Sequence, residues 1–229
     1  MKAQRLRVTF TRGDEMKYIT HLDLMRFWER VLRRAEIPVF YSEGFSPHPQ
    51  IALAAPLPVG VTSDAELMDV FLETVMLPRA FSERVTPQLT VAVQILRVEE
   101  AGLTLPSLQA EVRAAAYDVD IDAPLDAAVA RAVEELLAAE TFPWEHKRDE
   151  ETKAYDLRAL IHDITVEPGD GGLRLRMLLR ADNTGSGRPE QVAAALGLPQ
   201  PHRIHRTKLV LAGASAARDA WRKRGRFAG

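Results

Sequence analysis

Two histidines and an aspartate are the residues of this 229-residue chain best suited to acid–base chemistry. His21 lies at the start of an expected helix and close to Asp23, whose carboxylate can orient an imidazole. His48 lies between Pro47 and Pro49, which restrict the backbone and present the side chain outward. We therefore take His21, Asp23 and His48 as candidate catalytic residues. The alternative is that His21 only caps the helix through local hydrogen bonds.

Other reactive sites are excluded by what the sequence lacks. It contains no cysteine, so it has no thiol nucleophile, disulfide or cysteine-ligated metal cluster. Motifs of the types HExxH, GxGxxG, GxxxxGK and GxSxG are also missing. The sequence therefore predicts no cofactor and no metal.

Arginines form a second group of candidate site residues. On an expected strand, Arg5 and Arg7 alternate with apolar residues and should point outward, while a following helix carries arginines on one face. Such side chains position a nucleic-acid backbone through salt-sensitive contacts. The candidate nucleic-acid or partner-binding residues are Arg5, Arg7, Arg26, Arg30, Arg33, Tyr41, Phe45, Arg174, Arg176, Arg206 and Lys208.

The charge distribution leaves two interpretations of these arginines open. Residues 99–170 contain 18 acidic and 6 basic residues, whereas residues 201–229 contain 8 basic and 1 acidic residue. This asymmetry indicates a polyanion-binding side and an acidic side. Alternatively, the arginines form ion pairs with the acidic middle segment.

The elements that must position these residues follow a repeated order. In the first hundred residues, strands are expected at 5–11, near 51, at 66–73 and at 90–98, with helices from Thr20 to Pro38 and over 78–88. In the second half, strands are expected at 110–121, 142–146, 154–166, 171–180 and 203–211, with helices at 125–139 and 189–196. The predicted fold class is α+β, a tandem ferredoxin-like arrangement of β-α-β-β-α-β twice, with one additional strand.

The same pattern predicts the domain organisation. We expect a first unit over residues 1–100, a second over 110–212, and a basic C-terminal tail over 213–229. No apolar run reaches the ~18 residues that a membrane helix needs. A soluble, cytoplasmic protein without membrane contact is therefore expected.

Three runs in the first unit, YITHLDLMR, VFYSEGFSPHP and LPVGVTSDAE, resemble the radical-SAM-linked protein family. The resemblance is strongest over residues 5–75 and implies a partner, because members of that family are encoded beside or fused to a radical S-adenosylmethionine enzyme. Since this chain has no cysteine, it is not itself that enzyme.

The residues and the resemblance together predict an accessory or substrate-presenting protein for a radical S-adenosylmethionine enzyme that binds RNA through its arginines. Two alternatives stay open. One is a metal-independent RNA-processing enzyme that uses His21 and His48, and the other is a protein-binding adaptor without RNA.

Overall fold

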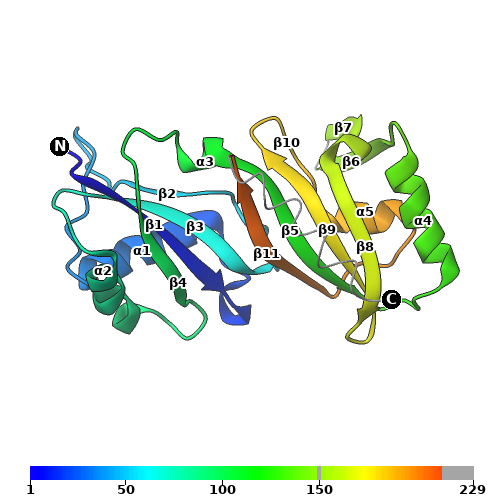
Figure 1. The fold of residues 1–229 in the computed structure, drawn as a ribbon, viewed down its shortest axis with the longest axis horizontal. Coiled ribbons are helices and arrows are strands. Elements are labelled where there is room, and N and C mark those ends of the chain that lie inside the picture. Colours follow the sequence, from blue (N-terminus) through cyan, green and yellow to red (C-terminus); the bar gives the residue numbers. More distant parts are fainter. Residues whose placement is uncertain (149–150, 213–229) are drawn as a thin grey trace. The chain divides into compact units, whose positions relative to one another are not determined.

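The computed structural model describes residues 1–148 and 151–212 and divides the chain into two compact units (Figure 1). The first unit is Met1–Val112, and the second begins at Arg113. The predicted basic tail, 213–229, lies outside the described residues. Within the described ranges, no helix has the length and apolar composition needed to cross a bilayer.

The first unit has the element order predicted for it. Its strands are β1 (Gln4–Arg12), β2 (Ile51–Leu53), β3 (Thr62–Leu72) and β4 (Ile95–Ala101), and its helices are η1 (Asp14–Met16), α1 (His21–Arg34), α2 (Pro78–Val85), η2 (Thr86–Gln88) and α3 (Leu108–Glu111). The strands lie in the order β4-β1-β3-β2, and each neighbouring pair is antiparallel. Thus β1 and β3 are the two central strands of this unit.

Helix α1 forms where the sequence supplies both a cap and an apolar stripe. The Thr20 side chain accepts a hydrogen bond from the backbone N–H of Asp23, which satisfies one of the unpaired donors of the first turn. The helix buries Trp28 and Val31, among others, and the Trp28 ring packs edge-on against Phe10 of β1. The buried face begins with Leu24, whereas Leu22 in the first turn is exposed.

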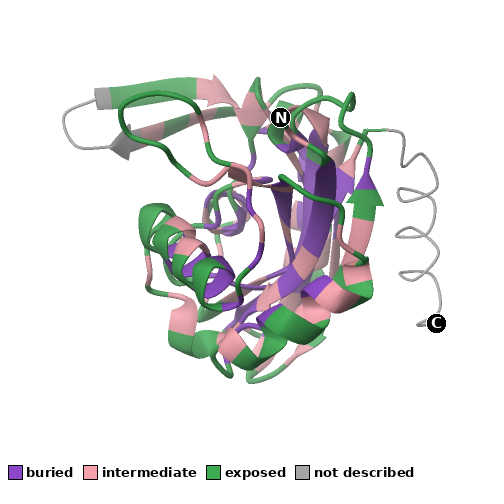
Figure 2. Cartoon of the chain, turned by 90° about the vertical axis from the view of Figure 1, so that its left-hand side faces the viewer, coloured by how far each residue is buried: buried purple, intermediate pink, exposed green. Residues whose placement is uncertain are grey.

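One face of β1 lies in the core of the first unit. Leu6, Val8 and Phe10 are fully buried there together with Trp28 of α1 and Phe81 of α2. The cartoon coloured by exposure shows the same division, with buried positions along the strands and exposed positions on the outer turns of the helices (Figure 2). The predicted inward set of β1 is therefore confirmed.

The second unit has more strands than the repeated order requires. Its elements are β5 (Val112–Ile121), α4 (Ala127–Ala138), β6 (Pro143–Arg148), β7 (Glu151–Asp156), η3 (Arg158–Leu160), β8 (Ile161–Gly169), β9 (Gly172–Asp182), β10 (Gly185–Ser186), α5 (Pro189–Ala195) and β11 (Arg203–Leu211). Strands β10, β9, β5 and β11 are neighbours in that order, and β8 also pairs with β9. Strands β6 and β7 form a separate antiparallel hairpin.

The prediction of one continuous strand over residues 154–166 of the second unit is wrong. Residues 154–166 are divided among the end of β7, η3 and β8. The break has a local cause, because the Asp156 side chain accepts the backbone N–H groups of Phe142 at 2.8 Å and Arg158 at 3.0 Å and turns the chain there. The observed fold is mixed α+β with mostly antiparallel pairing, and the tandem ferredoxin-like arrangement stays a prediction.

Candidate functional site

The strand arginines of the first unit are buried. Arg5 and Arg7 of β1 are only 2% and 8% exposed, and both contact Asp69, which lies opposite Arg7 on β3. Arg5 Nε donates to Asp69 Oδ2 at 2.8 Å, and its Nη2 contacts the same oxygen. Arg7 donates from Nε to Oδ1 at 2.9 Å and from Nη2 to Oδ2 at 3.1 Å. One buried carboxylate therefore binds two guanidinium groups.

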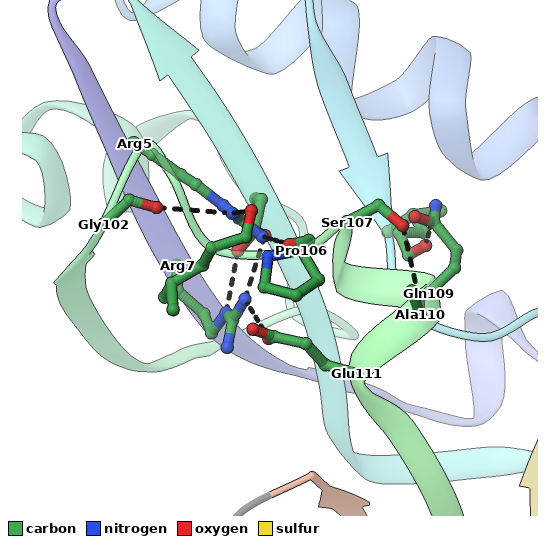
Figure 3. Close-up of polar contacts among 11 residues, drawn as sticks. Arg5, Arg7, Gly102, Pro106, Ser107, Gln109, Ala110 and Glu111 are labelled. Atoms are coloured by element: carbon green, nitrogen blue, oxygen red, sulfur yellow. Dashed lines mark hydrogen bonds and ion pairs between the residues drawn. The ribbon is translucent and has the colours of Figure 1, made fainter.

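Residues 102–111, at the end of the first unit, cover this pair of arginines (Figure 3). Arg5 donates to the backbone carbonyl oxygens of Leu105 at 3.1 Å and Pro106 at 3.0 Å. Arg7 Nη2 lies 2.7 Å from Glu111 Oε2. Burial opposes the charged form of Arg7, but hydrogen bonds and charges from Asp69 and Glu111 outweigh it and raise its pKa. The prediction that Arg5 and Arg7 face solvent is wrong, because residues 102–111 occupy that side of β1.

A related cluster in the second unit is more open. Asp120 of β5 is 1% exposed and accepts hydrogen bonds from Arg174 Nε at 2.6 Å and Arg203 Nη1 at 3.3 Å. Burial alone would raise the pKa of Asp120, but these hydrogen bonds and the two positive charges lower it. The side chain of Arg203 is 53% exposed, so water reaches this cluster from one side.

The other candidate cations of the second unit differ in their pairing and exposure. Arg176 lies 3.4 Å from Asp118 and 4.0 Å from Glu167 in ion pairs. Arg206 is buried, whereas Lys208 is exposed. The alternative that arginines pair with the acidic middle segment is therefore confirmed for Arg7, Arg174 and Arg176.

The arginines of α1 have different surroundings. Arg26, Arg30 and Arg33 are all exposed along one side of the helix. Arg26 lies 3.6 Å from Asp23 in an exposed pair. Over the described ranges 1–148 and 151–212, neither Arg30 nor Arg33 has a carboxylate within ion-pair distance. We call Arg26, Arg30 and Arg33 the α1 arginine row, and all three residues are exposed to solvent.

The structure does not bring the candidate catalytic residues together. Asp23 accepts a hydrogen bond from the Thr20 hydroxyl at 2.7 Å, and this contact, ahead of the charge of Arg26, lowers its pKa. His21 begins α1, which follows the end of β1. No hydrogen bond or ion pair among the described residues joins His21 to Asp23 or to His48.

The two histidines also lie toward opposite ends of the strands of the first unit. The chain next to His48 pairs with the end of β3, since Phe71 donates its N–H to the Gln50 carbonyl at 3.0 Å. Phe71 pairs with Arg5 near the start of β1, whereas His21 follows the other end of β1. A strand rises about 3.3 Å per residue, so nine residues span roughly 25–30 Å. The geometry offers no shared reacting centre for the two imidazoles.

The loop that carries His48 also presents the two candidate aromatic residues. Phe45 is fully exposed and Tyr41 is 43% exposed. At the base of the loop, Ser42 donates its N–H to the His48 carbonyl at 2.9 Å, and His48 donates its N–H to Ser42 Oγ at 3.0 Å. Tyr41 and Pro49 form an antiparallel bridge. The loop is thus closed at its base, with the Phe45 ring at its tip.

Sequence reasoning missed the carboxylates that organise the strand arginines. Asp69 and Asp120 each interrupt an apolar stretch, LMDVF and YDVDI, and aspartate is uncommon in strands. A buried charge within a strand requires a partner, so these two positions carried a usable signal. Arg12 was missed as well, although it donates to the carbonyl oxygens of Ile19 at 2.7 Å and Met16 at 3.0 Å.

Among the described residues, no group of three or more histidine or acidic side chains is arranged to hold a metal ion. The arrangement therefore presents two chemistries. One is internal pairing of arginine with carboxylate on the strands, and the other is unneutralised positive charge and exposed rings on α1 and the Tyr41–Pro49 loop.

Comparison with models of protein families identifies the family of this chain. A family model described as "Uncharacterized protein conserved in bacteria (DUF2344)" matches residues 5–189, and the chain belongs to this family. A search of curated proteins found no match. The family's description says nothing of a radical S-adenosylmethionine enzyme, so that link rests on the resemblance of the sequence runs.

Two crystal structures are similar in fold over 91% of this chain. A Cbf5-Nop10-Gar1 complex has 9% identity and a TM-score of 0.47 over 49% of its chain. The Nop10-Cbf5 complex of an archaeal box H/ACA sRNP has 12% identity and a TM-score of 0.43 over 48% of its chain. The chain thus spans about half the length of these structures, and similarity at this level carries no argument about function.

Proposed function

We propose that this protein is an accessory protein that holds RNA for a radical S-adenosylmethionine enzyme, with the α1 arginine row as its main contact to phosphate. The proposal includes two ferredoxin-like units, the second with the β6–β7 hairpin and β10 inserted. The catalytic step belongs to the partner enzyme.

One observation carries the RNA part of this proposal. The α1 arginine row is exposed, and neither Arg30 nor Arg33 has a carboxylate within ion-pair distance among the described residues. Arginine side chains in that state attract a polyanion and release its counterions on binding. Residues on successive turns of one helix also lie along a line, which suits a linear backbone of phosphates.

The partner enzyme is proposed from the sequence runs alone. The runs YITHLDLMR and VFYSEGFSPHP cover the first turns of α1 and the Tyr41–Pro49 loop. The residues that resemble the radical-SAM-linked family therefore overlap the surface with exposed arginines and rings. A surface used both for RNA and for delivery to an enzyme would concentrate such residues.

Charge reversal on α1 tests the RNA part. We expect Arg26→Glu with Arg30→Glu to weaken retention of RNA at least about tenfold and to lower the slope of log affinity against log salt by ~2, since two phosphate contacts are lost. The measurement is filter binding across a salt series.

A matched control separates this surface from net charge. Arg131→Glu with Lys153→Glu changes the charge by the same amount on exposed positions of the second unit. We expect this variant to keep RNA affinity within about twofold. Equal losses in both variants would mean that only total charge matters, and unchanged binding in the α1 variant would overturn the RNA proposal.

A pull-down from native lysate tests the partner. The tagged protein is divided into nuclease-treated and untreated halves, and proteins and nucleic acids are identified in both. A radical S-adenosylmethionine enzyme in both halves, with RNA only in the untreated half, is the expected result. Absence of such an enzyme from both halves would overturn the partner part.

A second candidate function is a protein adaptor without RNA. The pairing of Arg7, Arg174 and Arg176 with carboxylates favours it, because those arginines are already neutralised. The same pull-down distinguishes it, since an adaptor would bring down a protein partner with no RNA in either half.

A further inference from the structure

The Tyr41–Pro49 loop holds ring side chains away from the core. Phe45 at the tip is fully exposed, Tyr41 is 43% exposed, and His48 is also exposed. A single exposed aromatic residue is common on protein surfaces, whereas three exposed rings within nine residues of one loop indicate an interaction site. All three side chains are therefore accessible to solvent.

The main chain of this loop is constrained rather than free. Gln50 donates its N–H to the Phe40 carbonyl at 2.8 Å, and Ser42 and His48 exchange two further hydrogen bonds. Gly44, just before Phe45, has a φ of +127°, a conformation that side chains with a Cβ rarely adopt. The tip is therefore built around a glycine, and holding the rings there costs less entropy on binding than ordering a flexible loop.

From this geometry we propose that the Tyr41–Pro49 loop is a base-stacking site for single-stranded RNA, with Phe45 and Tyr41 as the stacking residues. This inference rests on the proposed RNA function and adds the class of RNA. Aromatic rings stack on nucleobases only where the bases are unpaired, whereas a duplex keeps its bases inside.

The Tyr41–Pro49 loop follows the α1 arginine row closely in the sequence. The loop begins a few residues after Arg34, the last residue of α1. Near that end, Arg34 Nη2 donates to the Gln88 carbonyl at 2.9 Å and Arg84 Nη1 to the Glu36 carbonyl at 3.4 Å. These contacts hold residues 84–88 against the C-terminal end of α1, from which the chain continues into the loop. Phosphate contacts along α1 and stacking at the loop are the two parts that proteins binding single strands combine.

The loop also contains one charge that opposes RNA. Glu43 is exposed beside Gly44, and its carboxylate would repel a nearby phosphate. A protein partner with a basic pocket would instead be attracted by Glu43 and accept Phe45 as an apolar anchor. This makes a protein-binding loop the competing outcome of the test.

The experiment measures anisotropy of two labelled RNAs, a 12-nucleotide oligouridine and a blunt-ended duplex in which every base is paired. We expect Phe45→Ala to weaken binding of oligouridine by between about 5-fold and 150-fold, which corresponds to ~1–3 kcal/mol for one stacked base, and to leave duplex binding within about twofold. Because Phe45 is fully exposed, the substitution leaves the core intact. Tyr41→Ala should act in the same direction.

Two further substitutions at the tip identify the kind of contact. Phe45→Trp should keep or improve oligouridine binding and add an indole emission that the bound bases quench. Phe45→Leu keeps an apolar side chain without an aromatic face and should lose as much affinity as Phe45→Ala. If Phe45→Leu binds as the wild type does, the ring is an apolar anchor and the stacking proposal is overturned.

The test separates this inference from the proposed function. If reversal of Arg26 and Arg30 abolishes binding while Phe45→Ala changes neither RNA, RNA binding stands and base stacking is overturned. If the wild-type protein binds neither RNA, both proposals fail and the loop is assigned to a protein partner. If Phe45→Ala weakens binding of oligouridine and of the duplex equally, selectivity for single strands is overturned.

Discussion

The arginines on the strands and those on α1 differ in their burial and in their hydrogen-bond partners. Arg5 donates to a buried carboxylate and to backbone carbonyls of the segment that follows β4, so its donors are used within the chain. Arg30 and Arg33 project from a helix with no carboxylate partner among the described residues. The comparison shows that an arginine-rich sequence can be structural in one element and available for binding in the next.

The two strand clusters, around Asp69 and around Asp120, also differ in how far their arginines are buried. Asp69 holds two arginines that are almost fully buried, whereas Asp120 holds Arg174 and a half-exposed Arg203. Water can replace part of what Asp120 supplies but none of what Asp69 supplies. Stability should therefore depend on Asp69 most, on Asp120 less, and on the α1 arginine row least.

The largest effect is expected at Asp69. Asp69→Ala leaves the buried Arg5 without a carboxylate and Arg7 with Glu111 alone, and it should lower the free energy of unfolding by about 3–5 kcal/mol, measured by urea denaturation. Asp14→Ala, which removes an exposed partner of Lys17, is the control and should cost less than about 1 kcal/mol. Similar costs for the two variants would contradict the idea that burial of the cluster matters.

An intermediate and pH-dependent effect is expected at Asp120. Asp120→Asn should cost roughly 1–3 kcal/mol at pH 7, because Arg174 and Arg203 lose a charged acceptor but keep water. The pKa of Asp120 is lowered in the folded protein. Its contribution is therefore complete above the unfolded value of ~3.9 and is lost as the pH falls through the lower folded value.

Urea denaturation at several pH values checks this expectation. The difference in unfolding free energy between wild type and Asp120→Asn should be constant near neutral pH and shrink below about pH 4. A difference that grows on acidification would show that the folded pKa is not lowered.

The smallest effect on stability is expected on α1. Arg26→Glu with Arg30→Glu should change the unfolding free energy by less than about 1 kcal/mol, because both side chains are exposed and only Arg26 has a weak ion pair. Urea denaturation of the same preparation used for RNA binding is the measurement. A large loss of stability would place these arginines with the structural group and remove the contrast.

The sequence predicted well where a local pattern decides the outcome. The strand expected over 171–180 corresponds to β9, and the helix expected from Thr20 begins at His21 as α1. These features depend on neighbours a few residues away, which periodicity and capping describe directly.

Prediction failed where the partner is distant in sequence. Alternation correctly put Arg5 and Arg7 on the face of β1 opposite Leu6, but it did not show what covers that face. The cover is supplied by residues about a hundred positions later, and the carboxylate by β3. The candidate site follows the same rule, because exposure of the α1 arginine row follows from the helix period whereas the buried pairs follow from long-range register.

The contact between Arg5 and residues 102–106 also bears on how the protein folds during its synthesis. Three acceptors of Arg5, the carbonyls of Gly102, Leu105 and Pro106, are synthesised about a hundred residues after it. A nascent chain that ends before these residues would hold Arg5 through Asp69 alone, and the other donors of Arg5 would bond to water. We infer that the first unit completes its folding only when residues 102–111 have emerged from the ribosome. These residues follow β4, the last strand of that unit.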